Sequence, residues 1–334
     1  MFLKVPKIRF FSTKSLSKLP KIKIHPEVQQ AIKQGHPVVA LESTIITHGL
    51  PKPTNFEVAK SLEDIIRAEG AIPATIAVID GVPCVGLDLE QLSYLSNSEH
   101  SIKCGKRDLG FAISKQKTAG TTVSGTMTLA KIAGIDVFAT GGIGGVHRNA
   151  VGGENASLDI SSDLTELAGN PVLVVCAGVK SILDIPRTLE YLETHAVPVA
   201  TLSEIENNVQ FPAFYSPNSG IESPIVVSGV EQVAESWLAH RDLLRQESGF
   251  VLAVPPANLK ESDSKLIIDS INIALEESFN LGISGKEVTP FLLARVSELT
   301  DGASLRANVA LIENNAKIAA RIAQCLTVAR KVGI

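Results

Sequence analysis

The sequence has few aromatic residues, few cysteines and no long uninterrupted apolar run. Aromatic side chains make up 4% of the 334 residues, so the core must be built mostly from Val, Ile, Leu and Ala, which suits a sheet flanked by helices. The four cysteines, Cys84, Cys104, Cys176 and Cys325, form no CxxC pair and are expected to be reduced, mostly core thiols of an intracellular protein. Because no apolar run approaches the roughly 20 residues that cross a bilayer, we expect no membrane-spanning segment.

An excess of positive charge is also missing. Lys and Arg total 31 against 35 Asp and Glu, and the formal net charge is −4. A general basic surface is therefore absent, which argues against nucleic acid as a partner. The apolar share of 45% and the charged share of 20% are typical of a globular protein.

The first 24 residues differ from the rest of the chain. Their basic residues all precede the first acidic residue, Glu27, and alternate with Phe, Leu, Val and Ile before a Ser-containing stretch. This composition is typical of a mitochondrial transit peptide, and the alternative is a disordered basic tail. We therefore expect residues 1–24 to lie outside the fold, with a mitochondrial location, the alternative being cytoplasmic, and residues 25–334 to form a single domain.

From residue 25 onward, buried strand-like runs alternate with amphipathic helical patterns. Strands are expected at 37–44, at 74–87 around an Asp80-Gly81 hairpin turn, at 137–140, 172–180, 198–202 and 249–258, the last ending in a double proline. Helices are expected at 25–35, after an N-cap at Asn55, and at 88–98, 121–135, 181–197, 230–244, 265–282, 286–300 and 303–326. Residues 204–232 follow neither a strand nor a helix pattern throughout and are expected to be irregular with some extended pieces. No linker interrupts this order, which indicates one α/β domain of three layers.

A glycine-rich turn follows the predicted strand at 137–140. The segment VFATGGIGGVHR places Gly141, Gly142, Gly144 and Gly145 in a row, and glycines let backbone N–H groups approach a phosphate. The spacing matches neither GxxxxGK[ST] nor GxGxxG, so a merely tight turn is the alternative. Thr140, His147 and Arg148 flank the turn, and we expect them to contact phosphate.

Two further features of this stretch could carry chemistry. Lys180 ends the apolar run VVCAGVK, where partial desolvation favours the neutral amine that can form a Schiff base with a carbonyl; alternatively, its stem packs while its head reaches solvent. Asp159 and Asp163 are four residues apart and would share a helix face if residues 159–167 are helical. Their oxygens suit Mg²⁺ or Mn²⁺, or they are acids in the first turn of a helix.

Two more charged residues, Glu42 and Lys103, could carry chemistry at other places in the chain. Glu42 follows a predicted buried strand, where an apolar setting raises the pKa of a carboxyl group and suits it to proton transfer near neutrality. Lys103 lies in the basic segment KCGKR and could equally be a solvated charge.

The motifs LESTIITHGLP, KRDL, TTVSGTM, VFATGGIGGVHR, DISSDL, VVCAGVKSILD, YLET and GKEVTPFLLARV, in this order, resemble those of the pseudouridine-5′-phosphate glycosidases, also called the indigoidine synthase A-like family. The resemblance covers about residues 28–325. It implies a three-layer α/β/α fold with a mixed, largely parallel central sheet, a homotrimer, and reversible cleavage of pseudouridine 5′-phosphate to uracil and ribose 5-phosphate with a divalent metal such as Mn²⁺. It also implies a possible separate pseudouridine kinase as a partner.

The resemblance assigns roles to residues at matching positions. It makes Lys180 the nucleophile that forms a Schiff base on the ring-opened sugar and Glu42 the proton donor and acceptor. It makes Asp159 the metal ligand, and its remaining substrate positions are Lys103, Val123, Ser161, Ser162, Asp163 and Asn308. A C–C glycoside has no leaving-group oxygen to protonate, so the scheme with two carboxylates does not suffice and an amine is required.

Two other functions stay open from the residues themselves. The first is a different Schiff-base lyase acting on a sugar phosphate, of the aldolase type, which would use Lys180 without binding uracil. The second is a non-catalytic protein that binds a sugar phosphate through the glycine turn and would tolerate loss of Lys180 and Glu42.

Overall fold

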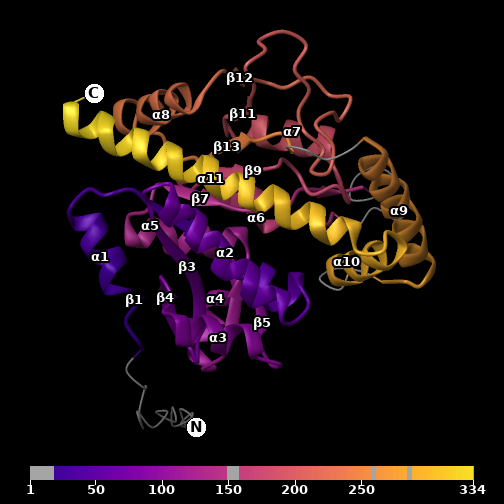
Figure 1. The fold of residues 1–334 in the computed structure, drawn as a ribbon, viewed down its shortest axis with the longest axis horizontal. Helices are drawn as coiled ribbons and strands as arrows, with labels where there is room; N and C mark the ends of the chain where they lie inside the picture. Colours follow the sequence, from indigo (N-terminus) through magenta and orange to yellow (C-terminus); the bar gives the residue numbers. More distant parts are fainter. Residues whose placement is uncertain (1–18, 149–157, 257–260, 284–287, 334) are drawn as a thin grey trace, which may run out of the picture.

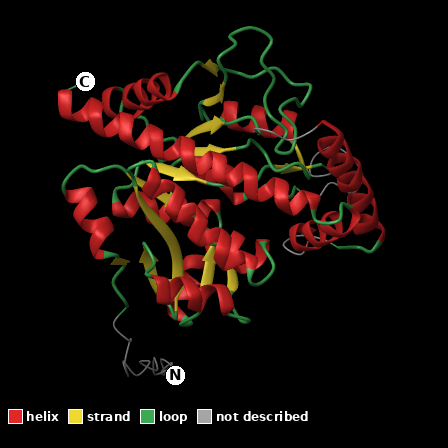
Figure 2. Cartoon of the chain, in the orientation of Figure 1, coloured by secondary structure: helices red, strands yellow, loops and turns green. Residues whose placement is uncertain are grey.

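A computed structural model describes residues 19–148, 158–256, 261–283 and 288–333, and Figures 1 and 2 show their arrangement. Most of the expected leader at 1–24 lies outside the described residues. The described part forms a single body in which helices cover a central sheet (Figure 2). No helix in the described ranges is long and apolar enough to cross a membrane.

A sheet of eleven strands organises the described residues. Its main path runs β1-β4-β3-β2-β7-β9-β13-β11-β12, and β6 pairs with β3 and β5. Pairing is parallel throughout this path and between β5 and β6, except that β3 is antiparallel to β4 and β6. The strands are β1 Lys23–Ile24, β2 Val38–Leu41, β3 Ile72–Ile79, β4 Val82–Val85, β5 Ile102–Cys104, β6 Ala119–Thr121, β7 Val137–Ala139, β9 Leu173–Cys176, β11 Val199–Leu202, β12 Val226–Val227 and β13 Phe250–Ala253.

Helices cover both faces of the sheet. One face carries α1 (Pro26–Lys33), α5 (Val123–Ala133), α6 (Ser162–Leu167) and α7 (Ile185–Thr194); the other carries α2 (Thr54–Ala68), α8 (Val230–Leu238) and α11 (Ala303–Val332). Side chains of a strand alternate between the faces: in β9, Val174 and Cys176 pack in the first core, and Leu173 and Val175 pack in the second. The expected three-layer α/β/α fold with a mixed, largely parallel sheet is therefore confirmed.

The chain also contains smaller elements around these layers. They are α3 (Leu89–Asn97), α4 (Leu109–Ser114) and a small antiparallel pair of β8 (Val146–His147) and β10 (Leu183–Asp184). The irregular region expected at 204–232 contains the short strand β12 near its end. The predicted hairpin turn at Asp80-Gly81 is also present, with both residues at positive φ between antiparallel β3 and β4.

Two helices, α9 (Glu261–Asn280) and α10 (Val288–Leu299), lie beside the first turns of α11 at one end of the molecule (Figure 1). Their apolar residues, among them Ile271, Leu292 and Val296, share a third core with Phe214 and Tyr215. Arg295 of α10 pairs with Glu277 of α9 at 2.6 Å. This α9–α10 cap stands over one edge of the sheet.

Two local predictions need correction. Asn55 is not an N-cap, because α2 already begins at Thr54; its buried amide instead donates to the carbonyl oxygens of Ile46 and Ser96, each at 2.9 Å. Asp159 and Asp163 do not share a helix face, because α6 begins only at Ser162. Ser161 is the N-cap of α6 and its hydroxyl accepts from the backbone N–H of Asp163, which prevents the helix from extending back to Asp159.

Candidate active site

Three neighbouring parallel strands end at the same edge of the sheet. Strand β2 leads into Glu42, β7 leads into Thr140 and the glycine turn, and β9 is followed by Lys180. The registered pairs Leu41–Ala139 and Ala139–Val175 place these ends side by side. Ligands of open α/β sheets bind at the carboxyl ends of strands, so this edge is the expected position for a site.

A cavity that opens to solvent occupies this edge. Its polar wall contains Glu42, Lys103 and Lys180, and its apolar wall comes from the α9–α10 cap and the loop that carries Phe214 and Tyr215. The remaining lining residues are Thr44, Ile45, His48, Gly49, Gly141, Gly142, Ser181, Ile182, Ile271, Leu292, Val296, Ser304 and Asn308. The lining therefore combines a few charged groups with many apolar ones, as small-molecule sites generally do.

Glu42 is nearly buried, with 9% of its surface exposed. The hydroxyl of Thr140, one residue past the end of the neighbouring strand, donates a short hydrogen bond to its Oε1. Burial raises the pKa of Glu42 above the ordinary value for a glutamate, while the charge of Lys180 and the Thr140 hydrogen bond act in the opposite direction. The site thus holds a carboxyl group that keeps its proton to higher pH than an exposed glutamate does.

Two lysines line the same cavity as this carboxyl group. Lys180 and Lys103 are both partly exposed and both line the cavity wall. Burial lowers the pKa of Lys103, and the nearby charge of Lys180 lowers it further, while Asp163 and Glu42 counteract the shift. These four charged groups therefore act on one another, and the expectation that Lys180 lies beside an acid and the glycine turn agrees with its position.

The glycine turn serves two different purposes. Gly141 and Gly142 line the cavity, and a Cβ on Gly142 would lie 2.5 Å from the ring of Phe214. Phe214 has a positive φ of 62°, an unfavourable conformation for an aromatic residue, and its ring packs over the turn. Gly144 instead donates its N–H to Asp163 Oδ2 at 2.9 Å, so this N–H is committed to a protein carboxylate.

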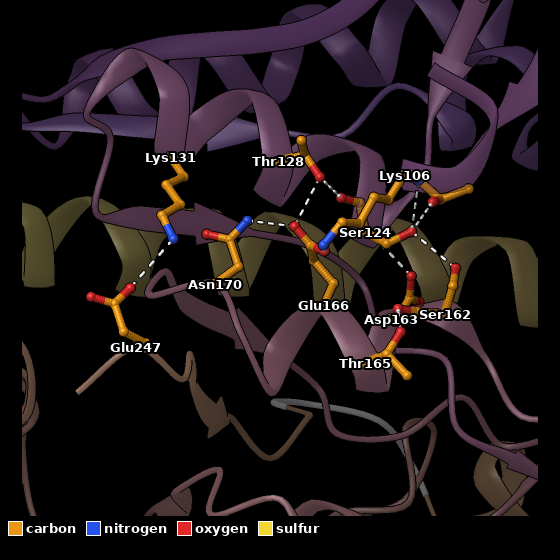
Figure 3. Close-up of polar contacts among 11 residues, drawn as sticks. Lys106, Ser124, Thr128, Lys131, Ser162, Asp163, Thr165, Glu166, Asn170 and Glu247 are labelled. Atoms are coloured by element: carbon orange, nitrogen blue, oxygen red, sulfur yellow. Dashed lines mark hydrogen bonds and ion pairs between the residues drawn. The ribbon is translucent and has the colours of Figure 1, made fainter. Parts of the chain in front are cut away.

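Helix α6 is fastened to its surroundings by Asp163. The carboxylate of Asp163 is buried and accepts the N–H of Gly144 on one oxygen and the N–H of Ser124, in the first turn of α5, on the other. The Ser162 hydroxyl lies 3.1 Å from the Ser124 hydroxyl, and Figure 3 draws this contact. Asp163 therefore holds α5, α6 and the glycine turn together. Its charge also acts to raise the pKa of Glu42 and the pKa of Lys103.

A second buried carboxylate, Glu166, lies one turn further along α6. It accepts hydrogen bonds from Thr128 of α5 and from Asn170, and it pairs with Lys106 Nζ at 2.5 Å (Figure 3). Its side chain is 1% exposed, whereas that of Lys106 is 56% exposed. Buried carboxylates need such partners, and this cluster anchors the far end of α6 to the segment that follows Lys103.

The stretch before α6 runs alongside the glycine turn. The backbone N–H of His147 donates to the Asp159 carbonyl at 3.1 Å, and Val146 forms a bridge with Ile160. The ring of His147 lies 3.7 Å from the Asp159 carboxylate, which is 36% exposed. The guanidinium of Arg148 donates to the Ser181 carbonyl at 2.8 Å, directly after Lys180.

A divalent cation fits this stretch only as a largely hydrated ion. In the described ranges no group of three or more His, Cys, Asp or Glu side chains could enclose a metal. Mg²⁺ and Mn²⁺ usually keep several waters and take one or two carboxylates, and the partly exposed carboxylate of Asp159 meets that requirement.

The predicted site residues fall into two groups. Glu42, Lys103, Lys180 and Asn308 line the cavity directly. The others are not among its lining residues: Thr140 is fully buried against Glu42, Val123 is buried at the start of α5, Ser161, Ser162 and Asp163 lie at the start of α6, and Asp159, His147 and Arg148 lie in or beside the stretch before it. Thr140 is therefore placed as a partner of a carboxyl group and not as a phosphate contact.

Several cavity residues were not identified from the sequence. Phe214 and Tyr215 come from the region interpreted as irregular, and Leu292 and Val296 come from a helix predicted only as a closing element. His48 lies in the quoted segment THGLP, on a π-helical turn at Ile45–Gly49, with Nδ1 2.7 Å from the Thr47 hydroxyl. Such π-helical turns are frequent at functional sites, but no sequence pattern announces them. Cys176, expected to be a core thiol, is fully buried, and burial raises its pKa to about 12.

Comparisons with known proteins agree with this architecture. The family model described as "Indigoidine synthase A like protein" matches residues 27–325. A pseudouridine-5′-phosphate glycosidase from Alkaliphilus metalliredigens is 50% identical over 301 residues, covering 90% of this chain and 95% of the relative. One from Arabidopsis thaliana is 48% identical, covering 92% of this chain and 90% of the relative.

Two solved structures share the fold. The prealnumycin C-glycosynthase AlnA, solved in complex with ribulose 5-phosphate, is 31% identical with a TM-score of 0.81, covering 93% of this chain and 98% of its own. An indigoidine synthase A-like protein from Thermotoga maritima is 34% identical with a TM-score of 0.80, covering 92% and 97%. The match of the family model across most of the chain, together with relatives of about half-identical sequence, shows that this protein belongs to the indigoidine synthase A-like family.

Proposed function

We propose that this protein cleaves the C–C glycosidic bond of pseudouridine 5′-phosphate reversibly, giving uracil and ribose 5-phosphate. One observation carries the proposal: two lysines, Lys180 and Lys103, and the protonatable carboxyl group of Glu42 line one cavity. Relatives that share about half of the sequence over nine-tenths of the chain are named for this activity.

Lys180 is the proposed nucleophile. Its amine attacks C1′ of the ribose, and the bond from C1′ to the ring oxygen breaks as that oxygen takes a proton. The uracil ring then takes a proton at C5, and the C1′–C5 bond breaks. Its electron pair goes to the protonated uracil, while the nitrogen lone pair completes a C1′=N bond. Water hydrolyses this Schiff base to ribose 5-phosphate and returns the free lysine.

Glu42 is the proposed donor and acceptor of these protons. A donor must hold its proton near the working pH, and burial favours the neutral form of this carboxyl group. Proton transfer of this kind typically contributes about 10²–10⁴-fold to a rate. Lys103, whose pKa is lowered by burial, is the proposed cationic contact for the sugar phosphate.

The two sides of the cavity suggest how the substrate lies. The proposed reaction joins an anionic sugar phosphate to a flat base. The charged wall suits the first, and the apolar wall of Phe214, Leu292 and Val296 suits the base. Asn308 lies 3.4 Å from the position of a Cβ on Gly141 and offers a carboxamide donor and acceptor there.

A divalent cation, Mn²⁺ in our proposal, would be held at Asp159 through its waters. When bound, such a cation supplies positive charge that neutralises phosphate. Within this chain, the backbone pairing of Asp159 with His147 fixes that carboxylate beside the glycine turn. Omitting the metal is expected to weaken substrate binding more than it alters the bonds made by Lys180.

One incubation tests the proposal. Pseudouridine 5′-phosphate and Mn²⁺ are added to the wild type, to Lys180→Ala and to Lys131→Ala, and free uracil is followed by chromatography. Lys131 is a matched control, because it is an exposed lysine of α5 that pairs with Glu247 at 3.5 Å. Uracil from the wild type and from Lys131→Ala, but not from Lys180→Ala, is the expected result.

The other outcomes point to the other functions. A sugar phosphate trapped on Lys180 by borohydride without any release of uracil would indicate a Schiff-base lyase of the aldolase type. Binding of ribose 5-phosphate with neither uracil nor a trapped adduct would indicate a non-catalytic binding protein. Mass spectrometry of the trapped peptide identifies the modified lysine.

Three wider features are also proposed. A homotrimer is consistent with the exposed apolar side chains Leu266 and Ile273, seven residues apart on α9, and light scattering of the purified protein measures it. A mitochondrial location follows from the basic start of the chain and is tested by imaging a tagged protein with and without residues 1–24. A separate pseudouridine kinase would supply the phosphorylated substrate, and a coupled assay from pseudouridine tests that order.

A further inference from the structure

A buried asparagine connects the long helix α11 to the proposed proton donor. Asn315 is completely buried, and its amide Nδ2 donates to the carbonyl oxygen of Thr140 at 2.8 Å and lies 3.4 Å from that of Gly141. The backbone N–H of Thr140 donates to the Val175 carbonyl at 3.0 Å. The backbone of Thr140 is therefore hydrogen-bonded both to β9 and to α11.

The side chain of Thr140 continues this chain of contacts. Its hydroxyl donates to Glu42 Oε1, and the pair lies one residue beyond the registered pair Leu41–Ala139. Asn315 of α11 thus reaches Glu42 at the end of β2 through Thr140, by way of its backbone carbonyl and its side chain. All three are buried or nearly buried, so water does not compete for these bonds.

We propose that Asn315, acting through Thr140, is a positioning residue that fixes the orientation of the Glu42 carboxyl group toward the substrate. This inference rests on the proposed function of Glu42 as proton donor. With Oε1 held by Thr140, Oε2 is the oxygen left to carry the transferred proton. A carboxyl group that rotated freely would present the proton in the wrong direction for much of the time.

The alternative is that Asn315 serves only the stability of the core. Its amide satisfies backbone carbonyls at the end of β7, and that alone would explain its burial. Its Oδ1 is buried and, within the described ranges, has no hydrogen-bond partner. The unpartnered oxygen is a desolvation cost that offsets part of what the bond to the Thr140 carbonyl contributes, and the titration of Glu42 distinguishes the two roles.

The charges that act on Glu42 come from several elements. Lys180 and Lys103 favour its ionised form, whereas Asp163 of α6 favours its neutral form, and the Thr140 hydrogen bond also lowers its pKa. His48 lies on the same cavity wall. The charged groups stay in place in a Thr140→Val variant, so a change in the titration of Glu42 would report the loss of one hydrogen bond.

The experiment compares Thr140→Val, Asn315→Ala and the double variant by infrared spectroscopy during a pH titration of the whole protein. The carboxyl band of Glu42 is assigned by its loss in Glu42→Gln. We expect the pKa of Glu42 to rise in Thr140→Val, to rise less in Asn315→Ala, and to be the same in the double variant as in Thr140→Val. Thr201→Val is the matched control, since Thr201 is also buried and hydrogen-bonded, but in β11, which pairs with neither β2 nor β7.

Turnover measurements give the second readout. The kcat for uracil release is expected to fall about tenfold or more in Thr140→Val and Asn315→Ala with little change in KM, as expected when a reacting group is misplaced. An Asn315→Ala protein that unfolds more easily but keeps the Glu42 titration and kcat of the wild type would overturn the proposal. So would additive shifts in the double variant. If the wild type releases no uracil, the proposed function fails, yet the infrared titration still decides whether Asn315 acts on Glu42.

Discussion

Replacing Gly144 by alanine would test whether the glycine turn positions α6. A Cβ on Gly144 would lie 2.6 Å from Ser161 Cβ, closer still to its Oγ, and 2.7 Å from Asp163 Oδ2. Ser161 is a short side chain that caps α6, so it cannot swing aside as the end of a lysine could. The start of α6 must therefore move. Overpacking of this kind typically costs about 1–3 kcal/mol of unfolding free energy.

The same movement should reach the proposed substrate contacts. Ser161, Ser162 and Asp163 would shift together, and Asp163 would lose its 2.9 Å bond from the Gly144 N–H. If the same cost of about 1–3 kcal/mol appears in substrate binding, KM for pseudouridine 5′-phosphate rises by about 5-fold to more than 100-fold. Denaturant unfolding and steady-state uracil release measure the two effects separately.

Gly110→Ala is the matched control for this test. Gly110 is exposed in α4, and a Cβ there would have no heavy atom within 4 Å. Alanine inside a helix is more stable than glycine by roughly 0.5–1 kcal/mol, so this variant should be slightly stabilised with KM unchanged. A Gly144→Ala protein with the unfolding midpoint and KM of the wild type would refute the reasoning, because α6 would then tolerate a side chain where the structure leaves no space.

Three further predictions concern charge, metal and core. Because burial raises the pKa of Glu42 above its ordinary 4.5, the folded state binds this proton more tightly than the unfolded state, so wild-type stability should fall relative to Glu42→Gln as pH rises from about 4.5. Thermal unfolding at several pH values checks this, and a wild type whose stability relative to Glu42→Gln rises with pH would contradict it. Asp159→Asn should raise the Mn²⁺ concentration needed for half-maximal uracil release while leaving the unfolding midpoint within a few degrees; an unchanged metal dependence would remove Asp159 as a ligand. Trp237→Ala should lower the free energy of unfolding in urea by about 3–5 kcal/mol, because Trp237 of α8 is fully buried in the core that α8 and α11 share with the sheet. A loss below about 1 kcal/mol would count against this packing.

Much of the layer architecture could be predicted, because it depends on local periodicity. The alternation of buried runs with amphipathic helices fixes the α/β class, and Asp80-Gly81 announces the β3–β4 turn. The order of strands in the sheet could not be read in this way. Strand β3 pairs in parallel with β2 along its first half and antiparallel with β4 and β6 along its second, and no residue pattern within β3 marks the change.

The sequence draws attention to the charged residues that line the cavity more than to the apolar ones. Glu42 and Lys180 are conspicuous, because charged residues at the ends of buried strands are unusual, and Lys103 lies in a basic segment. Phe214 and Leu292 look like ordinary core residues, and only the packing of the α9–α10 cap brings them to the cavity. Thr140 was expected to bind phosphate. Its contact with Glu42 was missed, because a sequence does not show whether a hydroxyl faces a ligand or a neighbouring carboxyl group.

Helix α11 has a consequence for how the protein becomes competent. It covers one face of the sheet, and it also sends Asn308 into the cavity and Asn315 to the Thr140 carbonyl. A fragment ending before residue 303 would contain the lysines and the glutamate that we assign to the reaction, yet would leave a strip of Val, Leu and Ile uncovered. Such a fragment should be a substrate for chaperones and proteases and should not turn over pseudouridine 5′-phosphate. Both resistance to proteolysis and completion of the site would then depend on the packing of α11 against the sheet.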